Sequence, residues 1–184
     1  MPAKILQSGN ALLRSIAKEV PISEIRTAKI KKIISDMGKA LASQDDGVAI
    51  AAPQIGVPLC IFVVSGKVLA YIKSEEWNNE TAKKYNDLIF INPVITKSSK
   101  KKKGMEEGCL SVRYLYGKVK RAAKVTLMAY NEKGVKITRG ASDLMAQVFQ
   151  HETDHLEGIL FTDMATDLKE ISPEELKKRA RSHP

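Results

Sequence analysis

The His-Glu-x-x-His motif that runs from His151 to His155 is the feature that most restricts how this chain can fold. Four residues advance an α-helix by slightly more than one turn, so both imidazoles leave from one helix face and can hold one metal ion. Glu152 follows the first histidine and can reach a water molecule bound to that ion. The motif therefore predicts a helix with two metal ligands and a carboxylate for acid/base chemistry.

Apolar residues in the same segment place the histidine face toward a protein core. Leu144, Val148 and Leu156 flank the motif, and two unpaired imidazoles would be costly in apolar surroundings. The alternative is a pair of surface histidines beside acidic neighbours, which these flanking residues disfavour. We expect the helix to run from about Ser142 to Glu157 and to end at Gly158.

A catalytic site of the zinc type needs three protein ligands and one open position. Within the helix, Asp154 points away from the histidines and Asp143 lies two turns upstream, while His183 is close to the chain end. Cys109 remains, in the polar segment Glu106–Ser111, where a structural cysteine has no obvious role. Two imidazoles and one thiolate suit Fe(II), Zn(II), Ni(II) or Co(II).

The length and the hydrophobic pattern predict one domain, residues 1–184, with an α+β fold. The chain has 184 residues, of which 43% are hydrophobic, enough for a single core. Apolar spacing predicts an amphipathic helix over about Ile22–Ala42. A C-terminal helix is expected over about 172–181, with Ser172 as N-cap, Pro173 in the first position and Glu175 completing a capping box.

Short β-type segments fill the middle of the chain, and we expect them to form antiparallel sheets around the metal-binding helix, with the other helices at the two ends. The segment Lys73–Asp87 is polar and reads as a surface insertion. Pro93 should lie at a sheet edge or a bulge. The expected strands are Leu59–Val64 and Val68–Ile72 as one hairpin, Leu88–Ile95 alone, and Val119–Tyr130 with Val135–Thr138 as a second hairpin.

The net charge of +9 favours encounter with polyanions such as ribosomal RNA, although general solubility is the simpler explanation. The stretch Lys97–Lys103 holds five lysines and no aromatic residue, so a solvated loop or hairpin tip is favoured and sequence-specific nucleic-acid binding is not expected. Cys60 lies in an apolar run and should be an inert buried thiol. Neither a signal peptide nor a membrane span is evident, so we expect a cytoplasmic protein without membrane contact.

Three separated segments resemble the signature motifs of the peptide deformylases, in the family's order and with similar spacing. These segments are Gly47–Gln54, Glu107–Ser111 and Gln150–His155. The resemblance, which covers most of the chain, implies that Cys109, His151 and His155 hold Fe(II), with Zn(II), Ni(II) or Co(II) able to replace it. A cysteine ligand separates this family from the thermolysin-like proteases, which share the His-Glu-x-x-His motif.

The resemblance also implies an activity, the removal of the formyl group from the N-terminal formylmethionine of nascent polypeptides. Glu152 would act first as general base and then as acid. The side-chain amide of Gln54 and the backbone N–H of Leu110 would hold the formyl oxygen. The partners implied are N-formylmethionyl peptides, and the basic surface would suit a site of action on the ribosome.

Residues for substrate binding follow from the same motifs and from the helix phase. Gly47, Val48 and Ala49 lie in the segment along which the substrate backbone is expected to align. Leu144 and Val148 precede His151 on its helix face and are candidates for a methionine pocket, although core packing explains them equally well.

The chain departs from the family pattern at three positions. Ala49 stands where a second glycine is usual, Arg113 lies where a proline is frequent, and Gln147 is polar for a methionine pocket. These differences predict an altered substrate preference or rate. Two other functions stay open, a metallopeptidase, which more often uses His or Glu as third ligand, and a metal-binding module without turnover, which would not need Glu152.

Overall fold

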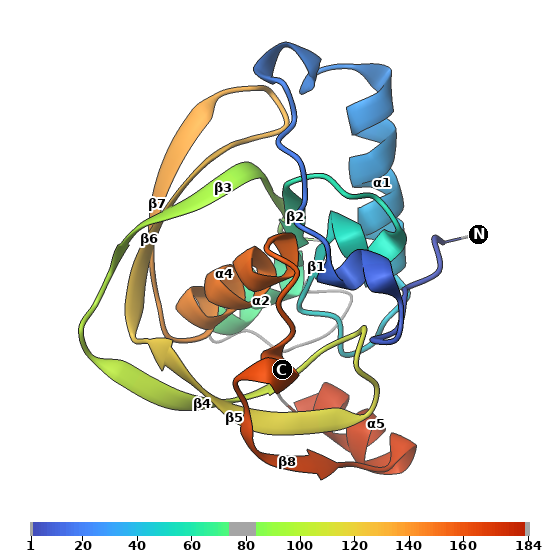
Figure 1. Cartoon of the computed structure of the whole chain (residues 1–184), viewed down its shortest axis with the longest axis vertical. Coiled ribbons are helices and arrows are strands. Elements are labelled where there is room, and N and C mark those ends of the chain that lie inside the picture. The colour runs from blue at the N-terminus through green and yellow to red at the C-terminus, as the bar shows by residue number, and fades with distance from the viewer. Residues whose placement is uncertain (1, 74–83, 183–184) are drawn as a thin grey trace.

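Two antiparallel β-sheets enclose one helix in the computed structural model, which describes residues 2–73 and 84–182 (Figure 1). The five-stranded sheet has the order β1-β2-β3-β6-β7, and the three-stranded sheet has the order β4-β5-β8. This arrangement confirms the predicted α+β class. The strands are β1 Ala49–Ala51, β2 Ile61–Val64, β3 Leu88–Ser98, β4 Lys102–Gly108, β5 Leu115–Ala122, β6 Lys124–Tyr130, β7 Lys136–Ser142 and β8 Thr166–Glu170.

The enclosed helix is the predicted metal-binding helix. It spans Asp143–Leu156, within one residue of the expected bounds at each end, and Figure 1 shows it between the sheets as α4. The C-terminal helix is also confirmed, because Ser172 Oγ accepts a hydrogen bond from Glu175 N at 3.1 Å. The helices and 3-10 turns are η1 Ala11–Arg14, η2 Ile22–Glu24, α1 Ala28–Ala42, η3 Ala52–Ile55, α2 Gly66–Ile72, α4 Asp143–Leu156, η4 Phe161–Asp163 and α5 Pro173–Ser182.

The buried strand β2 shows how one sheet serves two cores. Successive side chains of a strand point to opposite faces, so Phe62 and Val64 pack in the cluster that contains α4 residues. Ile61 and Val63 pack on the other face, in the cluster that contains α1 residues. The sheet is therefore covered on both sides, which explains why this strand is apolar throughout.

Phe149 fixes α4 onto the five-stranded sheet. Its ring centroid lies 5.0 Å from that of Phe90 and 6.0 Å from that of Phe62, and all three side chains are buried. Two residues correspond to about 200° around a helix, so the side chain of His151 leaves α4 on the face opposite to Phe149. Packing of the aromatic cluster therefore turns the histidines toward β4 and β5.

Gln150 holds the corner at which the chain passes from one sheet to the other. Its Oε1 accepts a hydrogen bond from Ala122 N at 2.9 Å, and its Nε2 donates to Ala122 O at 3.1 Å. The next residue, Ala123, donates its N–H to Lys101 O at 2.9 Å. The expectation of one strand over Val119–Tyr130 was wrong, because a side chain from α4 replaces a strand partner at this break.

Two further expectations were wrong in detail. Val68–Ile72 is not a strand but part of α2, whose N-cap Ser65 accepts a hydrogen bond from Lys67 N. The helix expected over Ile22–Ala42 begins only at Ala28, after Thr27, whose Oγ1 accepts from Ile30 N at 3.4 Å. In both segments a capping hydroxyl sets the first residue of the helix. The spacing of apolar residues gives no information on the position of such a cap.

Other expectations are confirmed. Pro93 lies in a register shift between Ile91 and Val94, which is the predicted bulge. β6 and β7 pair as the predicted hairpin, with Tyr130 opposite Lys136. The insertion expected at Lys73–Asp87 falls largely outside the described residues. In the part of the chain that the structure describes, none of the helices has the length and apolarity to cross a membrane.

The packing of α4 gives a prediction on stability. Phe149→Ala removes a fully buried ring and leaves a cavity, so we expect the free energy of unfolding to fall by about 3–5 kcal/mol. Urea unfolding followed by circular dichroism measures the change. Val135→Ala serves as control, because that side chain is 54% exposed, and a loss of less than 1 kcal/mol for Phe149→Ala, of the order expected at the surface, would contradict the aromatic anchor.

Candidate metal centre

The three predicted ligands meet beside the centre of the molecule. Cys109 follows the end of β4, while His151 and His155 lie on α4, and one ligand atom from each falls within 4.8 Å of the other two. Cys109 Sγ is 3.2 Å from His155 Nε2. The structure thus brings together residues that are more than 40 positions apart in the sequence, as the motifs predicted.

The chemistry of this group fits a divalent metal ion. His151 Nδ1 contacts Glu107 Oε2 at 2.9 Å, which leaves Nε2 as its ligand atom. Two buried polar atoms, Glu152 Oε2 and His155 Nδ1, have no hydrogen-bond partner among the described residues. Two imidazoles and a thiolate are a donor set for Fe(II), Zn(II), Ni(II) or Co(II), so these three residues could hold such an ion.

A buried ion pair supports the first histidine. Arg121 on β5 donates from Nε to Glu107 Oε1 at 2.7 Å and from Nη2 to Glu107 Oε2 at 2.9 Å. Its Nη1 donates to Asp154 on α4 at 2.6 Å. Burial alone would raise the pKa of Glu107, but the hydrogen bonds from His151 and Arg121 lower it to about 2. Glu107 therefore stays ionised at neutral pH and fixes the orientation of the His151 ring.

The two cysteines differ in the direction of their pKa shifts. Burial raises the pKa of Cys60 to about 11, as expected for an inert thiol. Burial acts in the same direction on Cys109, but the charge of His155 and hydrogen bonds with both histidines lower its pKa to about 5. Only the thiolate is a good metal ligand, so Cys109 is already in the ligating form at neutral pH.

Glu152 is placed for proton transfer. It lies between the two histidines in the sequence, and its side chain is buried. Burial raises the pKa of Glu152 to about 7, although the charges of His151 and His155 act to lower it. A carboxyl group with a pKa near neutrality can both accept and donate a proton under working conditions.

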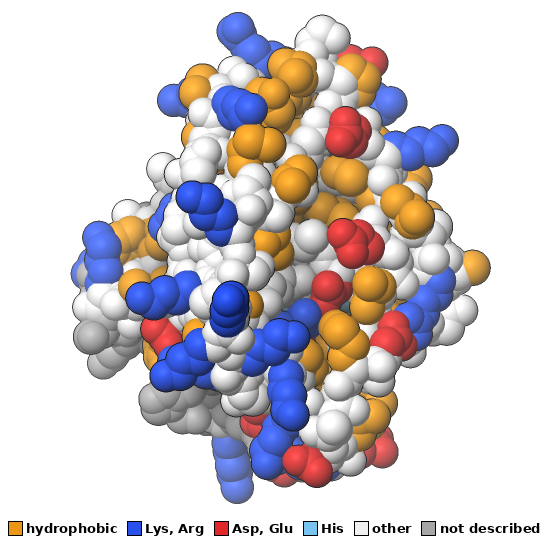
Figure 2. Space-filling model, turned by 60° about the vertical axis from the view of Figure 1, so that its left-hand side comes forward, with side chains coloured by type: hydrophobic (Ala, Val, Ile, Leu, Met, Phe, Trp, Pro, Cys, Tyr) orange, Lys and Arg blue, Asp and Glu red, His pale blue; other side chains and the backbone are white. Residues whose placement is uncertain are grey.

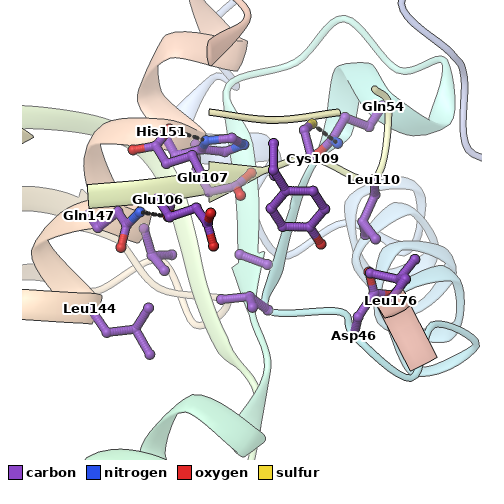
Figure 3. A pocket seen from close by; sticks show the side chains of 16 residues that line it. Asp46, Gln54, Glu106, Glu107, Cys109, Leu110, Leu144, Gln147, His151 and Leu176 are labelled. Atoms are coloured by element: carbon purple, nitrogen blue, oxygen red, sulfur yellow. Dashed lines mark hydrogen bonds and ion pairs between the residues drawn. The ribbon is translucent and has the colours of Figure 1, made fainter. Parts of the chain in front are cut away.

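Gln54 faces the cysteine from η3, the turn that follows β1. Its Oε1 accepts a hydrogen bond from Ala51 N at 2.7 Å, which orients the amide. Its Nε2 donates to Ser111 Oγ at 3.1 Å and lies 3.6 Å from Cys109 Sγ. The first and second motifs therefore meet at the metal ligands, with an amide donor directed into the site (Figure 3).

A cavity of about 300 Å³ opens beside these residues. It contains the expected Val48, Ala49, Leu144 and Val148, together with Gln54, Leu110 and Glu152. Gly47 is not among the residues that line it. A Cβ at this position would lie 2.8 Å from Leu41 O, so close packing against α1 explains the glycine. The full lining is Asp46, Val48, Ala49, Gln54, Glu106, Glu107, Gly108, Cys109, Leu110, Tyr116, Leu144, Gln147, Val148, His151, Glu152 and Leu176.

The three departures from the family pattern have structural explanations. Ala49 lies in β1, and its φ is not among the positive values, so alanine causes no strain there. Gln147 Nε2 donates to Glu106 O at 2.8 Å, so part of its polarity is satisfied by β4. Arg113 forms a two-bond ion pair with Asp46, at 2.5 and 3.1 Å.

Several residues that line the cavity were not predicted from the sequence. Asp46, Tyr116 and Leu176 line it but carry no motif that assigns them there. One sign was available for Tyr116, because it lies opposite Gly108, where a Cβ would come within 2.5 Å of the Tyr116 ring. A glycine next to a metal-binding cysteine can thus indicate close approach of an aromatic side chain.

The thiol environments give a prediction on metal removal. In metal-free protein at pH 7, iodoacetamide should modify Cys109 at least about tenfold faster than Cys60, because only Cys109 is a thiolate. Adding Ni(II) should protect Cys109 and leave Cys60 unchanged. Mass spectrometry of tryptic peptides measures both rates. Equal rates, or no protection by the metal, would contradict the ligand assignment.

Comparison with known proteins agrees with this geometry. The sequence model of the family described as polypeptide deformylase matches residues 2–170. The chain is 38% identical over 162 residues to peptide deformylase 1A, chloroplastic/mitochondrial, of Arabidopsis thaliana, covering 87% of this chain and 60% of that protein. It therefore spans less than two thirds of the length of this relative. Peptide deformylase 2 of Clostridium acetobutylicum is 39% identical over 165 residues, which cover 89% of this chain and 95% of that protein.

The fold is shared as well. A crystal structure of class I type b peptide deformylase from Acinetobacter baumannii, bound to Met-Ala-Ser, superposes with a TM-score of 0.76 at 27% identity. The alignment covers 89% of this chain and 98% of that one. The family match over nearly the whole chain, together with the Cys-His-His site, shows that this chain belongs to the polypeptide deformylase family.

Proposed function

We propose that this chain is a metal-dependent hydrolase that removes the formyl group from the N-terminal formylmethionine of newly made polypeptides. The observation that carries the proposal is the meeting of Cys109, His151 and His155 in one cavity with Glu152 and Gln54. The products are formate and a peptide with a free amino terminus. The membership of the family supports this activity.

Cys109, His151 and His155 would hold the metal, for which we propose Fe(II), with Zn(II), Ni(II) or Co(II) able to replace it. When bound, a divalent ion supplies Lewis acidity, which polarises a carbonyl and makes water nucleophilic near neutral pH. Glu107 and Arg121 keep the His151 ring in its ligating orientation. The soft thiolate of Cys109 adds a ligand type that suits iron and zinc better than magnesium or calcium.

Glu152 moves the proton during hydrolysis. It accepts a proton from the water whose oxygen forms the new bond to the formyl carbon. It then donates this proton to the amine nitrogen as the carbon–nitrogen bond breaks, which gives formic acid and a neutral amine. The acid loses its proton to the regenerated carboxylate or to water and leaves as formate. The pKa of Glu152, about 7, suits both steps, because burial makes the carboxylate a stronger base than a solvated one.

Gln54 and Leu110 stabilise the charge that develops on the formyl oxygen. The amide Nε2 of Gln54 is oriented by the hydrogen bond from Ala51 N, so it need not reorganise during the reaction. Leu110 follows the ligand Cys109 and lines the cavity, which supports this role for its backbone N–H. Preorganised donors of this kind typically contribute a factor of about 10²–10³ in kcat.

The apolar part of the cavity would hold the methionine side chain. Val48, Leu144 and Val148 line it, and all three were expected, Val48 from the first motif and the other two from the helix phase. A formyl group is the smallest acyl group, so crowding around the metal ligands would exclude longer acyl chains by size. We place the substrate backbone along the segment of Gly47, Val48 and Ala49.

We also propose that the chain works in the cytoplasm and approaches the ribosome through a basic face. Figure 2 shows many Lys and Arg side chains on the side of the molecule that carries the connection between β3 and β4. Lys97, Lys100, Lys101, Lys120 and Lys124 are exposed there. Clustered exposed cations attract the RNA phosphates without reading a sequence.

The activity predicts how Glu152→Gln behaves. Wild-type protein loaded with Fe(II) or Ni(II) under anaerobic conditions should release formate from formyl-Met-Ala peptides. Glu152→Gln should lower kcat by about 10²–10⁴, because the amide cannot transfer the proton, while the bound metal per chain stays the same. Glu157→Gln is the matched control, since Glu157 is exposed at the end of α4. Absence of formate release from metal-loaded wild type would disprove the proposed activity.

The basic face predicts a salt-dependent ribosome interaction. Lys100→Glu with Lys101→Glu should weaken co-sedimentation with ribosomes and make its dependence on salt less steep, because fewer phosphate contacts are formed. Turnover of a short formyl peptide should not change. Lys29→Glu with Lys31→Glu makes the same charge change on exposed residues of α1. Equal effects of the two pairs would show that only net charge matters and would refute this face as the contact.

A further inference from the structure

The segment that leads into β1 is contacted by the start of α2. Asp46, Val48 and Ala49 in this segment line the cavity. Ser65 donates its N–H to Val48 O at 2.9 Å, which extends the pairing of β1 with β2 by one residue. Two residues later, Lys67 reaches the turn that precedes Asp46. Neither Ser65 nor Lys67 lines the cavity, so both act on its wall from outside.

Lys67 donates hydrogen bonds from its ammonium group to the backbone of this turn. Its Nζ lies 3.2 Å from Asp45 O and 3.5 Å from Gln44 O. Gln44 O also accepts a hydrogen bond from Gly47 N at 3.1 Å, so the lysine joins the contact that closes the turn. Gly47 begins the segment along which we place the substrate backbone. The lysine therefore contacts the turn directly before this segment.

Lys67 occupies a position that is unfavourable for a cation. It is 4% exposed and is the second residue of α2, where the N–H groups at the helix start disfavour a positive charge. Burial lowers the pKa of its ammonium group, and the charges of Asp45, Asp46 and Asp87 oppose this shift. Three carboxylates thus retain a charge whose burial costs free energy, so a role other than packing explains the lysine better.

Arg113 holds the same turn by its side chains. Its guanidinium donates to Gln44 Oε1 at 2.9 Å and to the two carboxylate oxygens of Asp46 at 2.5 and 3.1 Å. Arg113 belongs to the segment after Cys109, whereas Lys67 belongs to the helix that follows β2. The turn is therefore fixed relative to the metal-binding segment through its side chains and relative to the five-stranded sheet through its backbone.

We propose that Lys67 is a positioning residue for substrate binding, and that it holds Gly47–Ala49 in the conformation that pairs with the peptide backbone. The inference rests on the proposed function, because it takes this segment as the place of the substrate. Pairing with the peptide backbone exists in the bound ground state and in the transition state alike. Loss of the lysine should therefore raise KM and leave kcat nearly unchanged.

Lys67→Met tests the role of the donor, because methionine keeps the apolar stem and removes the ammonium group. Asp45 is exposed, so water can solvate the freed carbonyl groups and the variant should fold. We expect KM for formyl-Met-Ala-Ser to rise about tenfold, while kcat stays within about twofold of wild type. Lys67→Arg keeps a cationic donor and should restore KM to within about threefold of wild type.

Two controls separate the loss of the donor from a change in charge and from a loss of helix stability. Lys39→Met makes the same substitution at an exposed position of α1. Val68→Ala leaves a cavity beneath α2, because Val68 is fully buried, but it retains Lys67. Both variants should have the KM of wild type, and thermal melting measures the stability of all four. An equal rise of KM in Val68→Ala and Lys67→Met would overturn the proposal.

Hydrogen–deuterium exchange and product binding test the inference without turnover. In Ni(II)-loaded protein, the backbone amides of Gly47–Ala49 should exchange about tenfold faster in Lys67→Met than in wild type. Calorimetry should show that Met-Ala-Ser binds about tenfold more weakly to this variant. Faster exchange without a change in binding or KM would make the lysine purely structural and would refute the positioning role. Absence of formate release from wild type, with both changes present, would refute the activity and support that role.

Discussion

The buried ion pair between Arg121 and Glu107 is the interaction on which the site depends. Both side chains are almost fully buried, at 6% and 2% exposure, and they join β5, β4 and, through Asp154 and His151, the helix α4. Removal of one partner of such a pair leaves an uncompensated charge and typically costs about 3–5 kcal/mol. The same contacts that fasten the small sheet to α4 therefore orient a metal ligand, so stability and site geometry are coupled.

This coupling explains why α4 is enclosed by two sheets rather than packed on one. Its Phe149 face anchors in the apolar cluster of the five-stranded sheet, and its His151 face meets polar groups from β4 and β5. Gln150, between these two faces, bonds the backbone at Ala122 where the chain changes sheets. The three consecutive residues Phe149, Gln150 and His151 thus contact the core, the corner between the sheets and the metal centre.

The motifs predicted the chemistry of this site better than its walls. Spacing on one helix and a cysteine without another role identified the three ligands, because ligand chemistry depends on residue type. The walls depend on tertiary approach, so nothing in the sequence indicated Asp46, and the one sign of Tyr116 was Gly108 on the neighbouring strand. The same limit applies to the fold, since the helical turn α2 and the break at Ala123 result from a capping hydroxyl and from Gln150.

The three departures from the family pattern differ in what their side chains contact. Ala49 and Gln147 are absorbed locally, one in an extended strand and the other through Glu106 O, so neither alters the metal centre. Arg113 instead forms an ion pair with Asp46, which lines the cavity. This pair links the segment after Cys109 to the cavity wall. Arg113 and Asp46 both lie outside the three motifs, so this contact can change while the metal ligands stay the same.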